Sequence, residues 1–139
     1  MSWIGEALRS SIGRKFVMGL LGLALTGFLA GHLGGNLLMF IGPAAFNGYA
    51  HHLEVFPLLI PIELALAAVF LLHAALGVWL TAENWLARPK GYAVKATKGQ
   101  ANIANRTMIY TGAIVFVFLI VHLLNLKYSP AREGELKLY

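Results

Sequence analysis

The chain has 139 residues, of which 58% are hydrophobic and only 12% are charged, a composition that excludes an ordinary soluble domain and favours an integral membrane protein. The formal net charge of +5 does not indicate a nucleic-acid partner, because the basic residues lie in short blocks between long apolar runs. The absence of cysteine excludes disulfides, iron–sulfur ligation and the attachment motif of c-type haem, so a metal centre would need histidine or carboxylate ligands.

Three apolar runs predict transmembrane helices over residues 16–41, 58–82 and 108–126. About 20 apolar residues cross the ~30 Å of hydrocarbon, and backbone groups within lipid must be satisfied inside the segment, which requires a helix. Between the first two runs, residues 44–53 predict a short interfacial helix, whose His51 and His52 are expected to face headgroups or water. The sequence therefore predicts an all-α fold, a single membrane domain over residues 1–139 with three transmembrane helices.

The basic residues predict the orientation of these helices. Three lysine or arginine residues follow the third run, and the connection between the first two runs has none. Eight precede the first run or lie between the second and third: Arg9, Arg14, Lys15, Arg88, Lys90, Lys95, Lys98 and Arg106. Because cytoplasmic loops carry the excess of lysine and arginine, the N-terminus and the loop between the second and third helices are predicted to be cytoplasmic.

Each predicted span contains one histidine, and an intramembrane histidine usually faces the bundle interior. His32 and His122 lie 17 and 16 residues after the basic residue that borders their spans, which is about 24 Å from the cytoplasmic side at ~1.5 Å per residue. His73 lies on the descending helix, nine residues before its predicted end, about 13 Å from the same side. His32 and His122 therefore share an outer level, and His73 occupies an inner level.

Two histidines at one depth on different helices suit haem b, because its iron is held from both faces of a flat macrocycle. Glycines would leave room for the porphyrin. Gly77 lies one turn from His73, and Gly22 and Gly112 lie at its level. The glycines beside His32 are Gly27, Gly31, Gly34 and Gly35. The alternatives are glycines that form helix-packing surfaces, and histidines that donate interhelical hydrogen bonds or relay protons. The matched pair favours haem ligation by His32 and His122, whereas His73 alone leaves these alternatives open.

Several motifs together resemble one family. They are Ser10-Ser11-Ile12-Gly13-Arg14-Lys15, Gly31-His32-Leu33-Gly34-Gly35-Asn36, Asn47-Gly48-Tyr49-Ala50-His51, Arg88-Pro89 with Gly91-Tyr92, and Asn105-Arg106-Thr107-Met108-Ile109-Tyr110-Thr111-Gly112. From about Ser10 to Asn125 the chain resembles the single-chain, dihaem cytochrome b anchor of bacterial succinate dehydrogenases and fumarate reductases. The resemblance implies a multi-pass protein of the bacterial cytoplasmic membrane that docks a flavoprotein and an iron–sulfur subunit and exchanges electrons with a quinone, expected to be menaquinone. Such a subunit transfers electrons, while succinate is oxidised on another chain.

The same resemblance implies the haem ligands. The family has five helices, with axial histidines on the first four, paired first with third and second with fourth. His32, His73 and His122 match the first three, and this pairing agrees with the predicted depths. The chain departs from the family because it ends at Tyr139, before the fourth ligand. Either the sequence is partial, or a further chain supplies the remaining helices, or a three-helix form holds one haem; the partner of His73 is expected on a fourth helix.

Quinone and proton sites are expected at both levels. At the cytoplasmic entrance, the Ser11 hydroxyl and the Arg14 guanidinium are expected to bind quinone carbonyls or haem propionates. The alternative is that Arg14 and Lys15 anchor the helix at anionic headgroups. Glu63 is an acid inside a span at the outer level, where burial favours its protonated form. It either transfers protons near an outer quinone site, with Glu54 as a second candidate, or forms a hydrogen bond to a neighbouring helix. Trp79 is expected to be an interfacial anchor.

Two other functions stay open. The chain could be the cytochrome b subunit of a different membrane dehydrogenase, such as a hydrogenase or formate dehydrogenase. It could instead be a structural or assembly subunit without haem, whose histidines only form hydrogen bonds. A reduced b-type absorbance band distinguishes the last reading from the other two.

Overall fold

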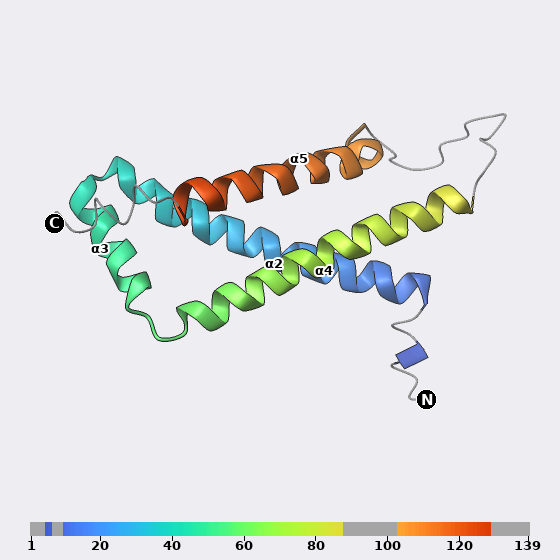
Figure 1. The fold of residues 1–139 in the computed structure, drawn as a ribbon, viewed down its shortest axis with the longest axis horizontal. Helices are drawn as coiled ribbons and strands as arrows, with labels where there is room; N and C mark the ends of the chain where they lie inside the picture. Colours follow the sequence, from blue (N-terminus) through green and yellow to red (C-terminus); the bar gives the residue numbers. More distant parts are fainter. Residues whose placement is uncertain (1–4, 7–9, 88–102, 129–139) are drawn as a thin grey trace. The chain divides into compact units, whose positions relative to one another are not determined.

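The computed structural model describes residues 5–6, 10–87 and 103–128. The regular secondary structure in these ranges is helical, and none of the described residues lies in a strand. The elements, drawn in Figure 1, are α2 (Ser11–Leu37), the short 3-10 helix η1 (Leu38–Phe40), α3 (Pro43–Glu54), α4 (Leu59–Leu86) and α5 (Ile103–Leu126).

Three helical segments are long and apolar enough to cross a membrane. They are Ser11–Phe40, Leu59–Leu86 and Arg106–Leu126. This confirms the prediction of an all-α fold with three candidate spans. The cytoplasmic N-terminus stays a prediction, because length and composition identify the spans but not their direction across a membrane. Of the basic residues behind this prediction, seven lie outside the described residues, namely Arg9, Arg88, Lys90, Lys95, Lys98, Arg132 and Lys137. The Arg88-Pro89 and Gly91-Tyr92 motifs lie outside them as well.

The helices extend beyond the apolar runs into polar sequence. The first begins at Ser11, ahead of the predicted residue 16, because the Ser10 side chain caps it and accepts a hydrogen bond from the Gly13 N–H at 3.0 Å. The second continues to Leu86, past the predicted residue 82, and the third begins at Ile103 where residue 108 was predicted. An apolar run marks the part suited to hydrocarbon, whereas a helix ends only where its backbone is capped or broken.

The first span ends in a chain reversal at Gly42. This residue has φ 142°, in a region that favours glycine because a side chain would be strained there. Pro43 follows as the first residue of α3, a position where its missing N–H leaves no bond unmade. The helix predicted over residues 44–53 is present and is one residue longer at each end.

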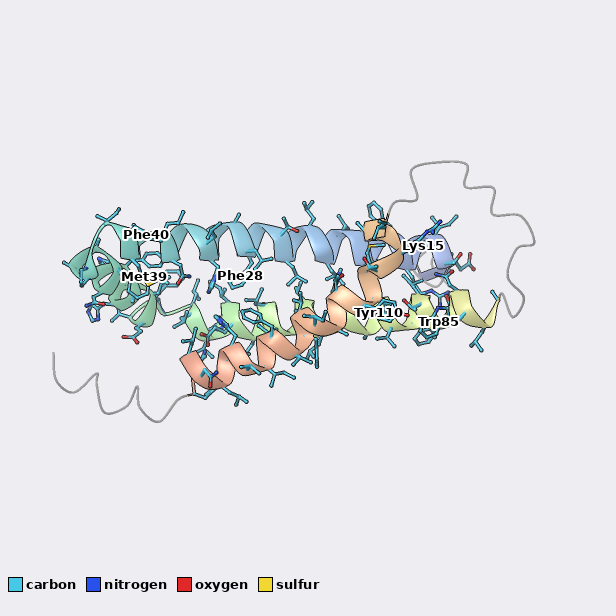
Figure 2. The ribbon with its side chains drawn as sticks, turned by 90° about the horizontal axis from the view of Figure 1, so that it is seen from above. Lys15, Phe28, Met39, Phe40, Trp85 and Tyr110 are labelled. Carbon is cyan, nitrogen blue, oxygen red and sulfur yellow. The ribbon has the colours of Figure 1, made fainter. Side chains whose placement is uncertain are left out.

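The chain divides into two compact units, Met1–Ala87 and Arg88–Tyr139. In the first unit α2 packs against α4, and the two helices run antiparallel (Figure 1). Lys15 and Trp85 lie at one end of this pair, and Met39 and Phe40 lie at the other (Figure 2). The second unit contains α5.

The helix pair of the first unit leaves most of its apolar surface uncovered. Leu80 is the buried hydrophobic residue among those described, at 7% relative exposure. Large side chains along both helices are more than half exposed, including Leu23, Leu29 and Leu71. Exposed apolar surface on this scale is unusual for a soluble protein and is expected where lipid covers the helices.

Helix α3 is held against the end of α2 by Tyr49. A Cβ atom built on Gly35 would lie 2.6–2.8 Å from atoms of the Tyr49 ring, so the ring occupies the space that a side chain would need. Gly35 is itself buried. Gly35 is one of the glycines predicted to make room for a porphyrin beside His32, whereas in the structure it packs against the Tyr49 ring.

Candidate functional site

The His73 ring lies between α4 and α2 and is half-buried. Its Nδ1 atom is 3.2 Å from the backbone carbonyl oxygen of Met18. A carbonyl oxygen only accepts hydrogen bonds, so Nδ1 carries the proton and donates it. In a neutral imidazole the other nitrogen, Nε2, then has an available lone pair. Metal-binding histidines are commonly oriented in this way, with one nitrogen on the metal and the other donating to a carbonyl.

Gly22 provides the clearance for this ring. It lies one turn after Met18 on α2, and a Cβ atom built on it would be 3.1 Å from Cε1 and 3.6 Å from Nδ1 of His73. The structure thus places Gly22 at the level of His73, as the rise per residue predicts. The expected role changes, however, because the space left by Gly22 receives the histidine ring.

The opposite helix has a related contact. Gly77 lies one turn after His73 on α4, and a Cβ atom built there would be 3.5 Å from the terminal methyl group of Met18, which is ordinary van der Waals contact. Met18 therefore approaches α4 with its side chain and binds His73 with its backbone carbonyl. This double contact sets the register between the two helices around the histidine.

These features fit an axial ligand of haem. The His73 ring has a fixed donor bond on one nitrogen, and among the described residues it has no further hydrogen-bond partner. Nowhere in the described ranges do three or more histidine or acidic side chains form a metal-binding group. Haem needs fewer protein ligands, because its porphyrin supplies the remaining bonds to iron.

His32 and His122, which are predicted to share the outer level, each lie beside a phenylalanine ring. On α2, the Phe28 ring lies 5.5 Å from the His32 ring between centroids. On α5, the Phe118 ring stacks on His122 at 5.3 Å, with an interplanar angle of 30°. Each phenylalanine precedes its histidine by four residues, a spacing that brings side chains together on a helix. Because α2 and α5 belong to different units, the pairing of His32 with His122 stays a prediction.

Asn36 is a further neighbour of His32. Its side-chain Nδ2 donates to the His32 carbonyl oxygen at 2.7 Å. The same nitrogen lies 3.4 Å from Nδ1 and 3.5 Å from Nε2 of the ring, distances too long for a strong bond. The amide is therefore held mainly by the backbone carbonyl.

A charged cluster joins the start of α2 to the end of α4. The Arg14 Nη2 atom lies 2.9 Å from Oε1 and 3.1 Å from Oε2 of Glu83. The Trp79 indole N–H donates to Glu83 Oε1 at 2.7 Å, and the Arg14 guanidinium carbon is 5.6 Å from the centre of the Trp79 ring. The Nε atom of Arg14 is buried and has no hydrogen-bond partner among the described residues.

The contacts of this cluster differ from those that the sequence predicts. Trp79 is predicted to be an interfacial anchor, and no role is predicted for Glu83. The spacing of four residues between Trp79 and Glu83 was a usable signal, because such residues meet on one helix face. Arg14 was expected to bind a quinone, a propionate or a headgroup, and the structure adds Glu83 to that set of partners.

The remaining candidates differ in their exposure. Ser11 is exposed in the first turn of α2, and Glu63 is half-buried near the start of α4. Glu54 is exposed at the last residue of α3, and His51 and His52 are exposed in the same turn. The place of these two histidines among headgroups or water stays a prediction.

Comparison of the chain with models of protein families, with curated proteins and with solved structures finds no match.

Proposed function

We propose that this chain is a haem b-binding, electron-transfer membrane anchor of a succinate:quinone oxidoreductase in the bacterial cytoplasmic membrane. The observation that supports it best is the hydrogen bond from His73 Nδ1–H to the Met18 carbonyl. The bond leaves the Nε2 lone pair of a neutral imidazole without a partner among the described residues. An unsatisfied polar atom in an apolar span is costly, and coordination to iron would satisfy it.

His73 would hold one haem at the inner level, and His32 with His122 would hold another at the outer level. When bound, haem b supplies reversible one-electron transfer. The Met18 carbonyl would orient the His73 ring through the hydrogen bond that it accepts from Nδ1–H. No other histidine of the chain is expected at the inner level, so the second axial ligand there would come from a helix outside these 139 residues.

The proposed orientation places the N-terminus and the inner level on the cytoplasmic side. An iron–sulfur subunit and a flavoprotein would dock on that side, and membrane lipid would cover the remaining apolar surface. Ser11 and Arg14 lie in the first turn of α2 at this border. The buried Nε of Arg14 has no partner among the described residues, which suits an acceptor such as a haem propionate or a quinone carbonyl.

Quinone chemistry also requires protons. Glu63 is a half-buried acid of α4, ten residues before His73 and so about 15 Å from it along the helix. With the inner level facing the cytoplasm, Glu63 falls at the outer level. We assign it a proton-transfer role there, for menaquinone or a related quinone, with Glu54 at the end of α3 on the same route.

A second candidate function is a structural subunit without haem. The bond between His73 and Met18 favours it too, because it joins α2 to α4 without needing a cofactor. A reduced-minus-oxidised absorbance spectrum of membranes containing the chain distinguishes the two. The proposed function requires a b-type band that decreases in His73→Ala, whereas a structural subunit shows no band in either protein. Co-purification of a subunit with covalently bound flavin then separates a succinate:quinone oxidoreductase from another dehydrogenase.

A further inference from the structure

The contact between His73 and α2 has two parts, one attractive and one steric. Nδ1–H donates to the Met18 carbonyl, and Cε1 faces the bare backbone of Gly22 one turn later. Carbon atoms in ordinary contact are about 3.5–4.0 Å apart. A Cβ atom on Gly22 would be only 3.1 Å from Cε1, so a side chain there would displace the ring.

This contact is specific to one glycine of α2. Cβ atoms built on Gly19, Gly27, Gly31 and Gly34 meet no atom within 4 Å. Gly77, on the other helix, would make only ordinary contact with Met18. Among these glycines, Gly22 alone limits the position of the histidine ring.

We infer that Gly22 is a positioning residue for His73, and that it tunes the haem bound by that histidine through the Met18 hydrogen bond. The inference rests on the proposed function. At 3.2 Å the Nδ1–O distance is already at the long end for such a bond, so a small displacement of the ring weakens it. The Met18 carbonyl cannot follow the ring, because it lies in the middle of a continuous helix.

A weaker bond changes the electronic character of the ligand. Donation from Nδ1–H to a carbonyl makes the metal-binding nitrogen more basic. A more basic ligand favours oxidised iron, and loss of the bond therefore favours reduced iron. Gly22 is thus predicted to hold the reduction potential of the inner haem below the value it would have with a displaced ring.

The test is a redox titration of the full chain in native membranes, comparing Gly22→Ala with the matched variant Gly19→Ala. Alanine is a better helix former than glycine, so both chains should accumulate as the wild type does. At the wild-type midpoint, Gly22→Ala should lower the oxidised-to-reduced ratio of the His73-dependent component by about tenfold, or 59 mV for one electron. Gly19→Ala should leave it unchanged.

The electron paramagnetic resonance spectrum of oxidised haem provides a second readout, since it responds to the orientation of the axial rings. Only the component lost in His73→Ala should shift in Gly22→Ala. Equal spectra and potentials in the two glycine variants would overturn the inference while leaving the proposed function in place. Loss of Gly22→Ala alone from the membrane would also overturn it, because the glycine would then serve packing only. Absence of a haem band from the wild type would instead contradict the proposed function.

Discussion

The guanidinium of Arg14 and the carboxylate of Glu83 form an ion pair, at 2.9 Å, between the first turn of α2 and the last turn of α4. Each charge is poorly placed on its own helix, since a cation is disfavoured at a helix N-terminus and an anion at a C-terminus. In an antiparallel pair these two ends lie together, so each side chain compensates the other. The pair also fixes which turn of α4 meets the start of α2.

Replacing Glu83 with glutamine should loosen this end of the helix pair. The Arg14 side chain is 23% exposed and that of Glu83 is 41% exposed, so solvent screens the interaction and the expected loss of stability is about 1 kcal/mol. Thermal unfolding in detergent should show it. In a double-mutant cycle with Arg14→Gln, the second substitution should add little to the first. Fully additive losses would mean that the two residues do not interact.

Replacing Gly35 with alanine should separate α3 from α2. The new methyl group would overlap the Tyr49 ring, and overpacking of this kind costs about 1–3 kcal/mol. The matched variant Gly34→Ala, where a Cβ atom meets nothing within 4 Å, should retain wild-type stability. Combining Gly35→Ala with Tyr49→Ala should recover part of the loss. The same unfolding temperature in both single variants would contradict the contact.

Replacing His32 or His122 with alanine should remove one reduced-haem component and leave membrane insertion intact. The two variants should lose the same component, because bis-histidine ligation fails when either ligand is absent. Redox difference spectra of membranes measure this, with His52→Ala as the control because His52 lies on α3, outside the three candidate spans. Retention of the full spectrum in both variants would exclude this pair as ligands.

Replacing His73 with alanine should remove a different component from the one lost with His32. The two sites use separate histidines at separate depths, so the outer component should persist in His73→Ala at wild-type intensity. Potentiometric titration resolves the two if their midpoints differ. A single component that disappears in all three histidine variants would support one haem only.

Reporter fusions should place the N-terminus in the cytoplasm. The prediction follows from eight basic residues on one side of the spans and three on the other. Fusions at Met1 and Gly91 should report the cytoplasm, and a fusion after Tyr139 should report the periplasm. A periplasmic signal from Gly91 would reverse the assignment of inner and outer levels.

The sequence predicted the spans well, because apolar runs of this length have few alternatives to a membrane helix. It also predicted that Gly22 and His73 share a level, since both depths follow from one rise per residue. It did not predict the acceptor for His73 Nδ1 or the partner of Glu83. Both depend on which face α2 and α4 turn toward each other. Side-chain packing between the two helices determines those faces. Gly35 was misinterpreted for the same reason, since a glycine that accommodates an aromatic ring looks like any other in the sequence.

The bond between Met18 and His73 joins residues 55 positions apart, yet both belong to the first two spans. Because a chain is synthesised from its N-terminus, this contact can form while the third span is still being made. The hydrogen bond to Met18 would then fix the tautomer of His73 before the third helix is present and before a cofactor binds. The pairing of α2 with α4 can therefore precede the addition of the third helix.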